Sequence, residues 1–225
     1  MIQFEPTEVE FEPCDGCDKG SLPPLYPMNV TSLFPSLLHK LDIYEFKDSN
    51  IYRDSLNYIS QERKKDPKGV DHTNIGGWQS NILGRDNVIT NFISREVHDY
   101  FFENEIFKSN VGIHLLNAWI NINKKGDYNT AHVHGDSHLS GCFYIKVPPN
   151  SGKIEFYSPH NYPYYVENAC YSDEFVQKYY SQSGRKFTPQ EGEIFIFPSG
   201  LYHSVESNQT RNERISVGFN LGLRY

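Results

Sequence analysis

The strongest constraint on the fold is a change of hydrophobic period near residue 112. Before this point, the window 86–105 carries apolar residues at the i, i+3, i+4, i+7 spacing of an amphipathic helix. After it, short apolar segments alternate with turns, beginning with a strand expected over 113–123. Short strands separated by turns are typical of jelly-roll sandwiches. We therefore expect a mainly β protein, with a double-stranded β-helix (jelly-roll, cupin-like) core and N-terminal helices packed on it.

The same patterns place the other elements. Further strands are expected at 141–147, 153–157, 192–197, 202–205 and 214–222. Nearer the N-terminus, loose alternation over 2–12 favours an opening strand, the segment 33–41 favours a helix beginning no earlier than Pro35, and 49–63 favours a second helix. Residues 158–190 show no clear period and are expected to form a long irregular loop that covers a site.

Length and composition limit the class of protein. A chain of 225 residues fits a single domain, 1–225, with a helical or irregular part at 1–111 and the jelly-roll core at 112–225. The net charge of −7 gives no electrostatic reason to expect nucleic acid or anionic membranes as partners. No apolar run approaches 18 residues and the first residues are acidic, so we expect a cytoplasmic protein without signal peptide or membrane span.

The cysteines do not indicate a disulfide scaffold. Cys14 and Cys17 form a C-x-x-C motif, but no second pair of zinc ligands lies nearby, and we interpret them as free thiols in a loop. Cys142 lies in an apolar segment and is expected to be a small buried filler.

A cluster of histidines lies just before the strand expected at 141–147. On a strand, residues two apart point to the same face, so His132 and His134 can converge, and a following turn can bring Asp136 near them. Imidazole and carboxylate together suit a divalent first-row metal. The alternative is a half-exposed strand with polar histidines on its solvent face.

Two residues far along the chain complete the candidate site. His203 follows a strand and a Pro-Ser-Gly turn, so its ring can face back into the barrel and supply a third metal ligand. Arg214 and Ser216 share one face of the last strand. An arginine that points into a barrel is costly unless a carboxylate meets it, and a dicarboxylic co-substrate would supply that partner. The alternative for Arg214 is a salt bridge at the rim, to Glu213 or Glu193.

Four linked motifs resemble a known superfamily. They are AWIN at 118–121, HVHGDSHLSGCFY at 132–144, FPSGLYH at 197–203 and RISVGFN at 214–220. The set resembles the Fe(II)/2-oxoglutarate-dependent dioxygenases, and most closely their family of 2OG-Fe(II) oxygenases with an H-x-H segment, LSG-x-x-Y, FPS-x-x-x-H and RIS-x-x-FN. The resemblance covers about residues 112–225, and GGWQS at 76–80 extends it weakly toward the N-terminus.

The resemblance implies a hydroxylase-type oxygenase that uses Fe(II), 2-oxoglutarate (2OG) as co-substrate and O₂. It implies His132, His134 and His203 as catalytic metal ligands. It also implies that Arg214, helped by Ser216 and Tyr144, holds the far carboxylate of 2OG. The superfamily's usual pattern is H-x-D/E, and His134 departs from it. Either His134 replaces the carboxylate, which we favour, or His134-Gly135-Asp136 is itself the H-x-D and Asp136 is the ligand.

The sequence leaves the substrate open. We expect a small-molecule or peptide substrate, with Trp78, Trp119, Asn121 and the loop 158–180 as candidates for its binding wall; ordinary aromatic packing is the alternative for each. A homodimer is the oligomer to consider. Two other functions compete: a cupin-like metal-binding jelly roll (an isomerase or ligand-binding module) without oxygenase activity, and an interaction protein with a degenerate site.

Overall fold

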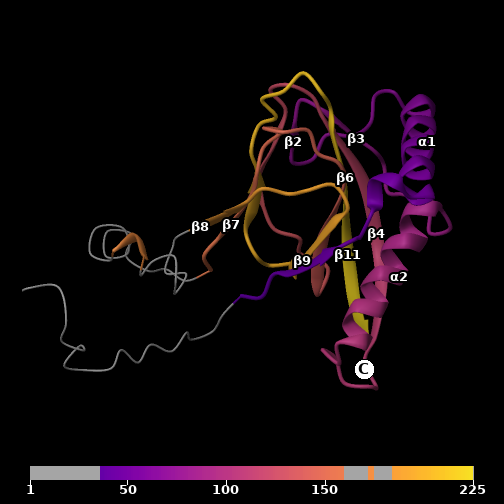
Figure 1. The fold of residues 1–225 in the computed structure, drawn as a ribbon, viewed down its shortest axis with the longest axis vertical. Helices are drawn as coiled ribbons and strands as arrows, with labels where there is room; N and C mark the ends of the chain where they lie inside the picture. The colour runs from indigo at the N-terminus through magenta and orange to yellow at the C-terminus, as the bar shows by residue number, and fades with distance from the viewer. Residues whose placement is uncertain (1–35, 160–171, 175–183, 225) are drawn as a thin grey trace, which may run out of the picture. The chain divides into compact units, whose positions relative to one another are not determined.

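The computed structural model describes residues 36–159, 172–174 and 184–224, all within a unit that spans Phe34–Tyr225 (Figure 1). The helices are η1 (Phe46–Asp48), α1 (Asn50–Lys65) and α2 (Val88–Glu103). The strands are β1 (His39–Asp42), β2 (Asn74–Ile75), β3 (Trp78–Gln79), β4 (Gly112–Asn123), β5 (Tyr128–His132), β6 (Leu139–Lys146), β7 (Ile154–Tyr157), β8 (Gly184–Phe187), β9 (Glu193–Pro198), β10 (His203–Val205) and β11 (Arg214–Arg224). The strand expected at 2–12 and the motif with Cys14 and Cys17 lie outside the described residues.

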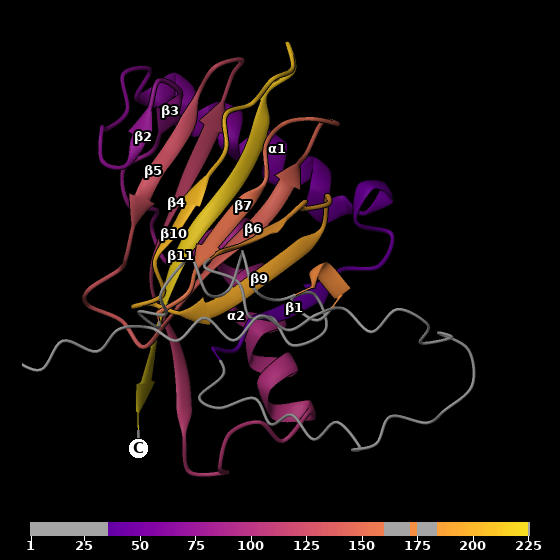
Figure 2. The ribbon, with the colours of Figure 1, turned by 90° about the vertical axis from the view of Figure 1, so that its left-hand side faces the viewer.

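The strands form two antiparallel sheets. A six-stranded sheet has the order β1-β9-β6-β11-β4-β3, and a five-stranded sheet has the order β2-β5-β10-β7-β8. Figure 1 shows α1 and α2 on one side of the six-stranded sheet and strands of the five-stranded sheet on its other side; Figure 2 shows the five-stranded sheet in front. The mainly β, jelly-roll architecture is thus confirmed. No helix in the described part of the chain is long and apolar enough to cross a membrane.

Alternation along each central strand sorts side chains between two environments. On β6, Phe143 and Ile145 belong to the core that includes the helices, whereas Tyr144 belongs to a second core between the two sheets. The same alternation on β11 turns Val217 and Phe219 toward the helices. The intervening residues face the five-stranded sheet, because successive strand side chains point to opposite faces. We call this second surface the inner face of the six-stranded sheet.

Helix α2 holds the outer face of that sheet. Its N-terminus carries a capping box. The Asn87 side chain accepts a hydrogen bond from the Thr90 backbone N–H, and the Thr90 hydroxyl accepts one from the Asn87 backbone N–H. Ile89, Ile93 and Val97 lie one helical turn apart and are at most 1% exposed. Burial of each such side chain contributes about 1.5–3 kcal/mol. The helix expected from the window 86–105 is confirmed, as is the one expected over 49–63.

Two expected elements were wrong. The segment that favoured a helix from Pro35 onward contains β1, which pairs with β9; Lys40 there forms an ion pair with Glu193 (2.5 Å). Part of the expected irregular loop 158–190 is strand β8, paired with β7, and most of the rest lies outside the described residues. Neither segment carries a strand pattern of its own, and each pairs with a strand that is distant in the chain, so tertiary pairing overrides the local pattern. Three short strands, β1 to β3, also come from the part expected to be helical or irregular.

Candidate metal centre

Three histidines converge where the two sheets meet. His132 ends β5 and His203 begins β10, and the two residues are direct partners in the antiparallel pairing of these strands. His134 lies two residues beyond β5, where its backbone N–H donates to the carbonyl of Ser199 (2.9 Å). The ring centroids are 4.3 Å apart for His132 and His203, and 5.1 Å apart for the other two pairs. One ring nitrogen from each histidine lies within 4.8 Å of the others.

Hydrogen bonds at Nδ1 fix the tautomer of each ring. Nδ1 of His132 lies 2.8 Å from the Thr130 carbonyl, and Nδ1 of His203 lies 2.9 Å from the Leu201 carbonyl. A carbonyl can only accept, so each Nδ1 carries the proton and donates it. In the third ring, Nδ1 of His134 donates to Oδ1 of Asn220 (2.6 Å). Nε2 of each neutral ring is left with its lone pair, which is the form that binds a metal.

Burial keeps these rings neutral. It lowers the pKa of His132 and of His134, and it lowers the pKa of His203 to about 3, where repulsion by His132 adds to the effect. A charged imidazole loses hydration inside the barrel, and this loss disfavours the charged form. At neutral pH all three rings are therefore available as metal ligands.

Asp136 is not part of this cluster. Within the described residues, the ring nitrogens of His132, His134 and His203 form a group close enough to share one metal ion, and Asp136 does not belong to it. The Gly135–Asp136 turn forms, but Asp136 is exposed to solvent. The geometry thus favours the three-histidine assignment over the alternative with a carboxylate.

Arg214 occupies the opposite end of the inner face. It is 1% exposed, and its guanidinium donates to the carbonyl of Ser151 (2.7 Å) and to Oδ1 of Asn123 (3.0 Å). Among the residues that the structure describes, no carboxylate forms an ion pair with it. The expected alternative, a rim salt bridge, is wrong: Glu213 pairs with Arg63 (3.0 Å) and Glu193 with Lys40.

A narrow cavity of about 50 Å³ joins the histidines to Arg214. The lining residues from the inner face of β4, β6 and β11 include Trp119, Asn121, Cys142, Tyr144, Ser216 and Gly218. In the described part of the chain, the Tyr144 hydroxyl, Oδ1 of Asn121 and Nε of Arg214 are buried without a hydrogen-bond partner. Burial raises the pKa of Tyr144 well above its usual value, so its hydroxyl stays protonated and can donate. Buried polar groups normally have partners.

Two of these unsatisfied groups, the Tyr144 hydroxyl and Nε of Arg214, are donors that fit the co-substrate that the sequence implies. A guanidinium and a phenol, with the Ser216 hydroxyl beside them, are the donors that a carboxylate accepts from. The neutral imidazoles at the other end fit a divalent metal.

The expected substrate wall is only partly at this cavity. Trp119 and Asn121 line it, whereas Trp78 is 6% exposed and donates its Nε1–H to the Asp66 carbonyl (2.8 Å). The turn before Trp78 needs Gly76 and Gly77, both with φ of +66°. Trp78 is therefore a packing residue. The sequence did not single out Asn220 as a site residue. Its position on β11, at even spacing from Arg214 and Ser216, could have indicated that it shares their face of the strand.

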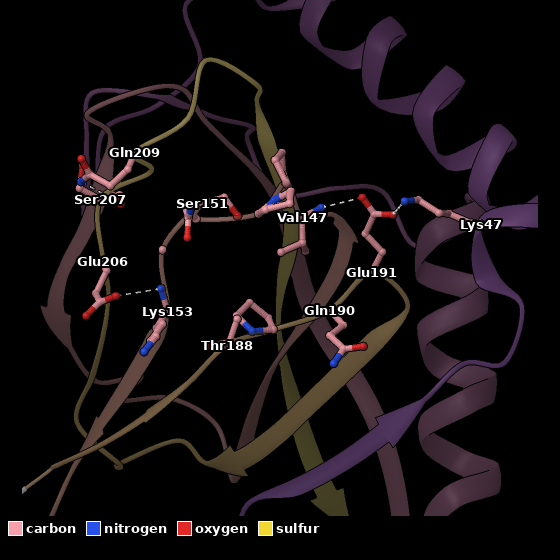
Figure 3. A pocket seen from close by; sticks show the side chains of 15 residues that line it. Lys47, Val147, Ser151, Lys153, Thr188, Gln190, Glu191, Glu206, Ser207 and Gln209 are labelled. Atoms are coloured by element: carbon pink, nitrogen blue, oxygen red, sulfur yellow. Dashed lines mark hydrogen bonds and ion pairs between the residues drawn. The ribbon is translucent and has the colours of Figure 1, made fainter.

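A larger cavity of about 640 Å³ has Ser151, Thr188 and Glu206 among its lining residues (Figure 3). Three loops line most of it, at 147–153, 188–191 and 206–209. None of the histidines lines it, but Ser151 does, and the carbonyl of Ser151 accepts from Arg214. The loop 147–153, which carries Ser151, thus helps to hold the Arg214 guanidinium in place.

Comparisons with known proteins agree with this arrangement. Residues 117–220 match the profile of a family described as "Putative 2OG-Fe(II) oxygenase". No curated protein matches the chain.

Solved structures share the fold at low sequence identity. A viral collagen prolyl hydroxylase from Paramecium bursaria Chlorella virus-1, in complex with 2OG, is 18% identical with a TM-score of 0.50; the match covers 82% of this chain and 94% of that one. A prolyl hydroxylase from Trichoplax adhaerens, in complex with a hypoxia inducible factor peptide fragment, is 14% identical with a TM-score of 0.55, over 81% and 83%. HygX from Streptomyces hygroscopicus, with nickel, 2OG and hygromycin B, is 12% identical with a TM-score of 0.53, over 81% and 82%.

The matched segment runs from β4 to β11 and contains the three histidines, Tyr144, Arg214 and Ser216. The jelly-roll core of this chain is similar to that of 2OG-Fe(II) oxygenases, in its fold and in the residues that the family profile matches.

Proposed function

We propose that His132, His134 and His203 hold Fe(II), and that Arg214, Ser216 and Tyr144 hold the far carboxylate of 2OG, in a hydroxylase-type oxygenase. One observation carries the proposal. Three neutral imidazoles, each with its Nδ1–H hydrogen-bonded, converge at one end of a cavity, and the other end holds a buried arginine that forms no ion pair with a carboxylate of the described residues. A metal site and a site for an acidic group, joined by one cavity, match the two ends of a 2-oxo diacid.

When bound, Fe(II) together with 2OG and O₂ supplies the oxidant: a substrate C–H becomes C–OH as 2OG and O₂ are converted to succinate, CO₂ and the transferred oxygen atom. The chain's own residues bind and orient. Arg214 supplies the charge that fixes the diacid, and the donors of Tyr144 and Ser216 set its direction. Phe156 and Phe197 of the second core both lie beside His203, which is 4% exposed, and keep bulk water from its ring.

The substrate of this oxygenase is proposed to be a small molecule or a peptide. The similar solved structures include both kinds, since one holds a peptide fragment and another holds hygromycin B. Trp119 is the candidate for substrate contact, because its ring lies 5.5 Å from that of His134 at the cavity. The net charge of −7 supports a substrate other than nucleic acid, and we further propose a cytoplasmic protein that can form a homodimer.

Arg214 discriminates this function from a cupin-like metal-binding jelly roll without oxygenase activity. Such a protein has no need for a buried guanidinium that lacks a carboxylate, and leaving one there is costly. The structure therefore favours the oxygenase.

The test is succinate formation from 2OG by the full chain with Fe(II), ascorbate and O₂. Uncoupled turnover is expected even without the substrate, and it should be lost in His203→Ala and strongly reduced in Arg214→Gln. Absence of turnover in the wild-type protein loaded with Fe(II), together with unchanged metal binding in Arg214→Gln, would favour the cupin-like alternative.

A further inference from the structure

We propose that Asn220 is a positioning residue for His134, holding this ring in the one orientation and tautomer in which its Nε2 reaches the metal. The inference rests on the proposed function, because it takes His134 to be a metal ligand. It assigns a role to a residue that does not itself line the cavity but contacts one of the histidines that do.

The contacts lock the Asn220 amide in one orientation. Its Oδ1 accepts from Nδ1 of His134 (2.6 Å) and from the hydroxyl of Ser140 (2.7 Å). Its Nδ2 donates to Oδ1 of Asn117 (2.9 Å). In this arrangement the amide oxygen faces both the imidazole and the Ser140 hydroxyl, and the amide nitrogen faces Oδ1 of Asn117, so all three contacts of the amide pair a donor with an acceptor.

The register of the sheet builds this network. Asn220 on β11 is the direct cross-strand partner of Asn117 on β4 and of Ser140 on β6. These three residues therefore form one polar row across three adjacent strands. A buried polar row is favourable only when its members satisfy one another. Ser140 is fully buried, whereas Asn117 and Asn220 are half-buried, so at Ser140 little solvent can replace a lost partner.

His134 depends on this row more than the other histidines depend on their partners. The rings of His132 and His203 are each held by a backbone carbonyl two residues earlier in their own segments. His134 lies in the connection after β5, and its ring is held by a side chain from β11, which lies far along the chain. Loss of the Asn220 amide should therefore release one ligand while leaving the other two in place.

The first experiment measures Co(II) binding to the full chain by visible absorption. Asn220→Leu keeps the shape but removes the acceptor, and loss of an outer partner of a ligating histidine typically weakens metal binding about 10- to 100-fold. Asn220→Asp, which restores an acceptor, should bind Co(II) more tightly than Asn220→Leu. In a His134→Ala background, Asn220→Leu should cause no further loss, because the two changes act through one ligand.

A second measurement needs no metal. In the metal-free protein, long-range ¹H–¹⁵N NMR correlations should show His134 with its proton on Nδ1, and a mixture of tautomers in Asn220→Leu. His132 and His203 should keep Nδ1–H in both proteins and serve as internal controls for folding.

The outcomes separate this inference from the proposed function. Equal Co(II) affinity in the wild type and Asn220→Leu, or an unchanged His134 tautomer, overturns the role of Asn220 and leaves the oxygenase proposal intact. Failure of the wild type to bind Co(II) overturns the metal site, and with it the inference.

Discussion

His132 and His203 lie directly opposite each other in the antiparallel pairing of β5 with β10, with their ring centroids 4.3 Å apart. Two candidate ligands are thus brought together by strand register and not by a loop. A slip of one residue would turn one of the rings to the other face of the sheet. The pairing also carries an irregularity between His203 and Val205, a kind of feature that often lies next to active sites.

His203→Ala should abolish metal binding. Removing a ligand costs more than removing an outer partner, so affinity should fall by more than about 100-fold. Fe or Co content after dialysis, measured by elemental analysis, checks this. His98→Ala is the matched control, because His98 is exposed on α2 and lies outside the cluster; it should bind metal like the wild type. Equal metal content in both variants would contradict the site.

Arg214→Gln should keep metal but lose affinity for 2OG. Two charge-assisted hydrogen bonds of about 1.5 kcal/mol each correspond to a rise of roughly 100-fold in the KM for 2OG. Steady-state succinate formation checks the KM, and Co(II) absorption checks the metal.

The matched control for Arg214 is Arg63→Gln. It removes the partly exposed ion pair with Glu213 and should change stability by no more than about 1 kcal/mol, with the KM unchanged. Loss of metal in Arg214→Gln would mean that the guanidinium supports the histidines and not the co-substrate.

The metal-free protein should lose stability as the pH falls below about 6.5. Because the folded state lowers the pKa of His203 to about 3, the unfolded chain binds a proton that the folded chain rejects between these values. This contribution is fully present above pH 6.5, and the free energy of unfolding should drop by up to about 1.4 kcal/mol per pH unit for this residue. Urea unfolding at pH 7.0 to 5.0 measures the slope. His203→Gln should have a shallower slope; an equal slope would contradict the assignment.

Gly218→Ala should displace Trp119. A Cβ at Gly218 would lie 2.6 Å from the Trp119 ring, closer than real contacts allow. Overpacking of this kind typically costs about 1–3 kcal/mol, and the displaced indole should change the tryptophan fluorescence. Gly200→Ala is the control, because nothing lies within 4 Å of its added Cβ, and it should leave stability and fluorescence unchanged. An unaltered spectrum in Gly218→Ala would show that the ring does not lie against β11.

Much of the fold could be predicted because periodicity is a local property. The amphipathic helix α2 and strands such as β4 and β11 carry their own pattern, so their residues predict them without knowledge of partners. Strands β1 and β8 carry no such pattern. They are strands because they pair with β9 and β7. A pattern read from a short stretch of sequence cannot predict such a pairing, because the partner strand lies outside that stretch.

The candidate site divides in the same way. The sequence by itself determined which residue types are available: histidines at positions 132, 134 and 203, and a period-two face on the last strand with Arg214. Only the tertiary structure decided that Asp136 stays in solvent while His134 turns inward, and that Asn220 meets Asn117 and Ser140. It also decided that Arg214 is buried and pairs with no carboxylate in the described part of the chain. The physical reason is that side-chain type and strand face depend on neighbouring residues, whereas burial and partners depend on the register between strands that are distant in the chain.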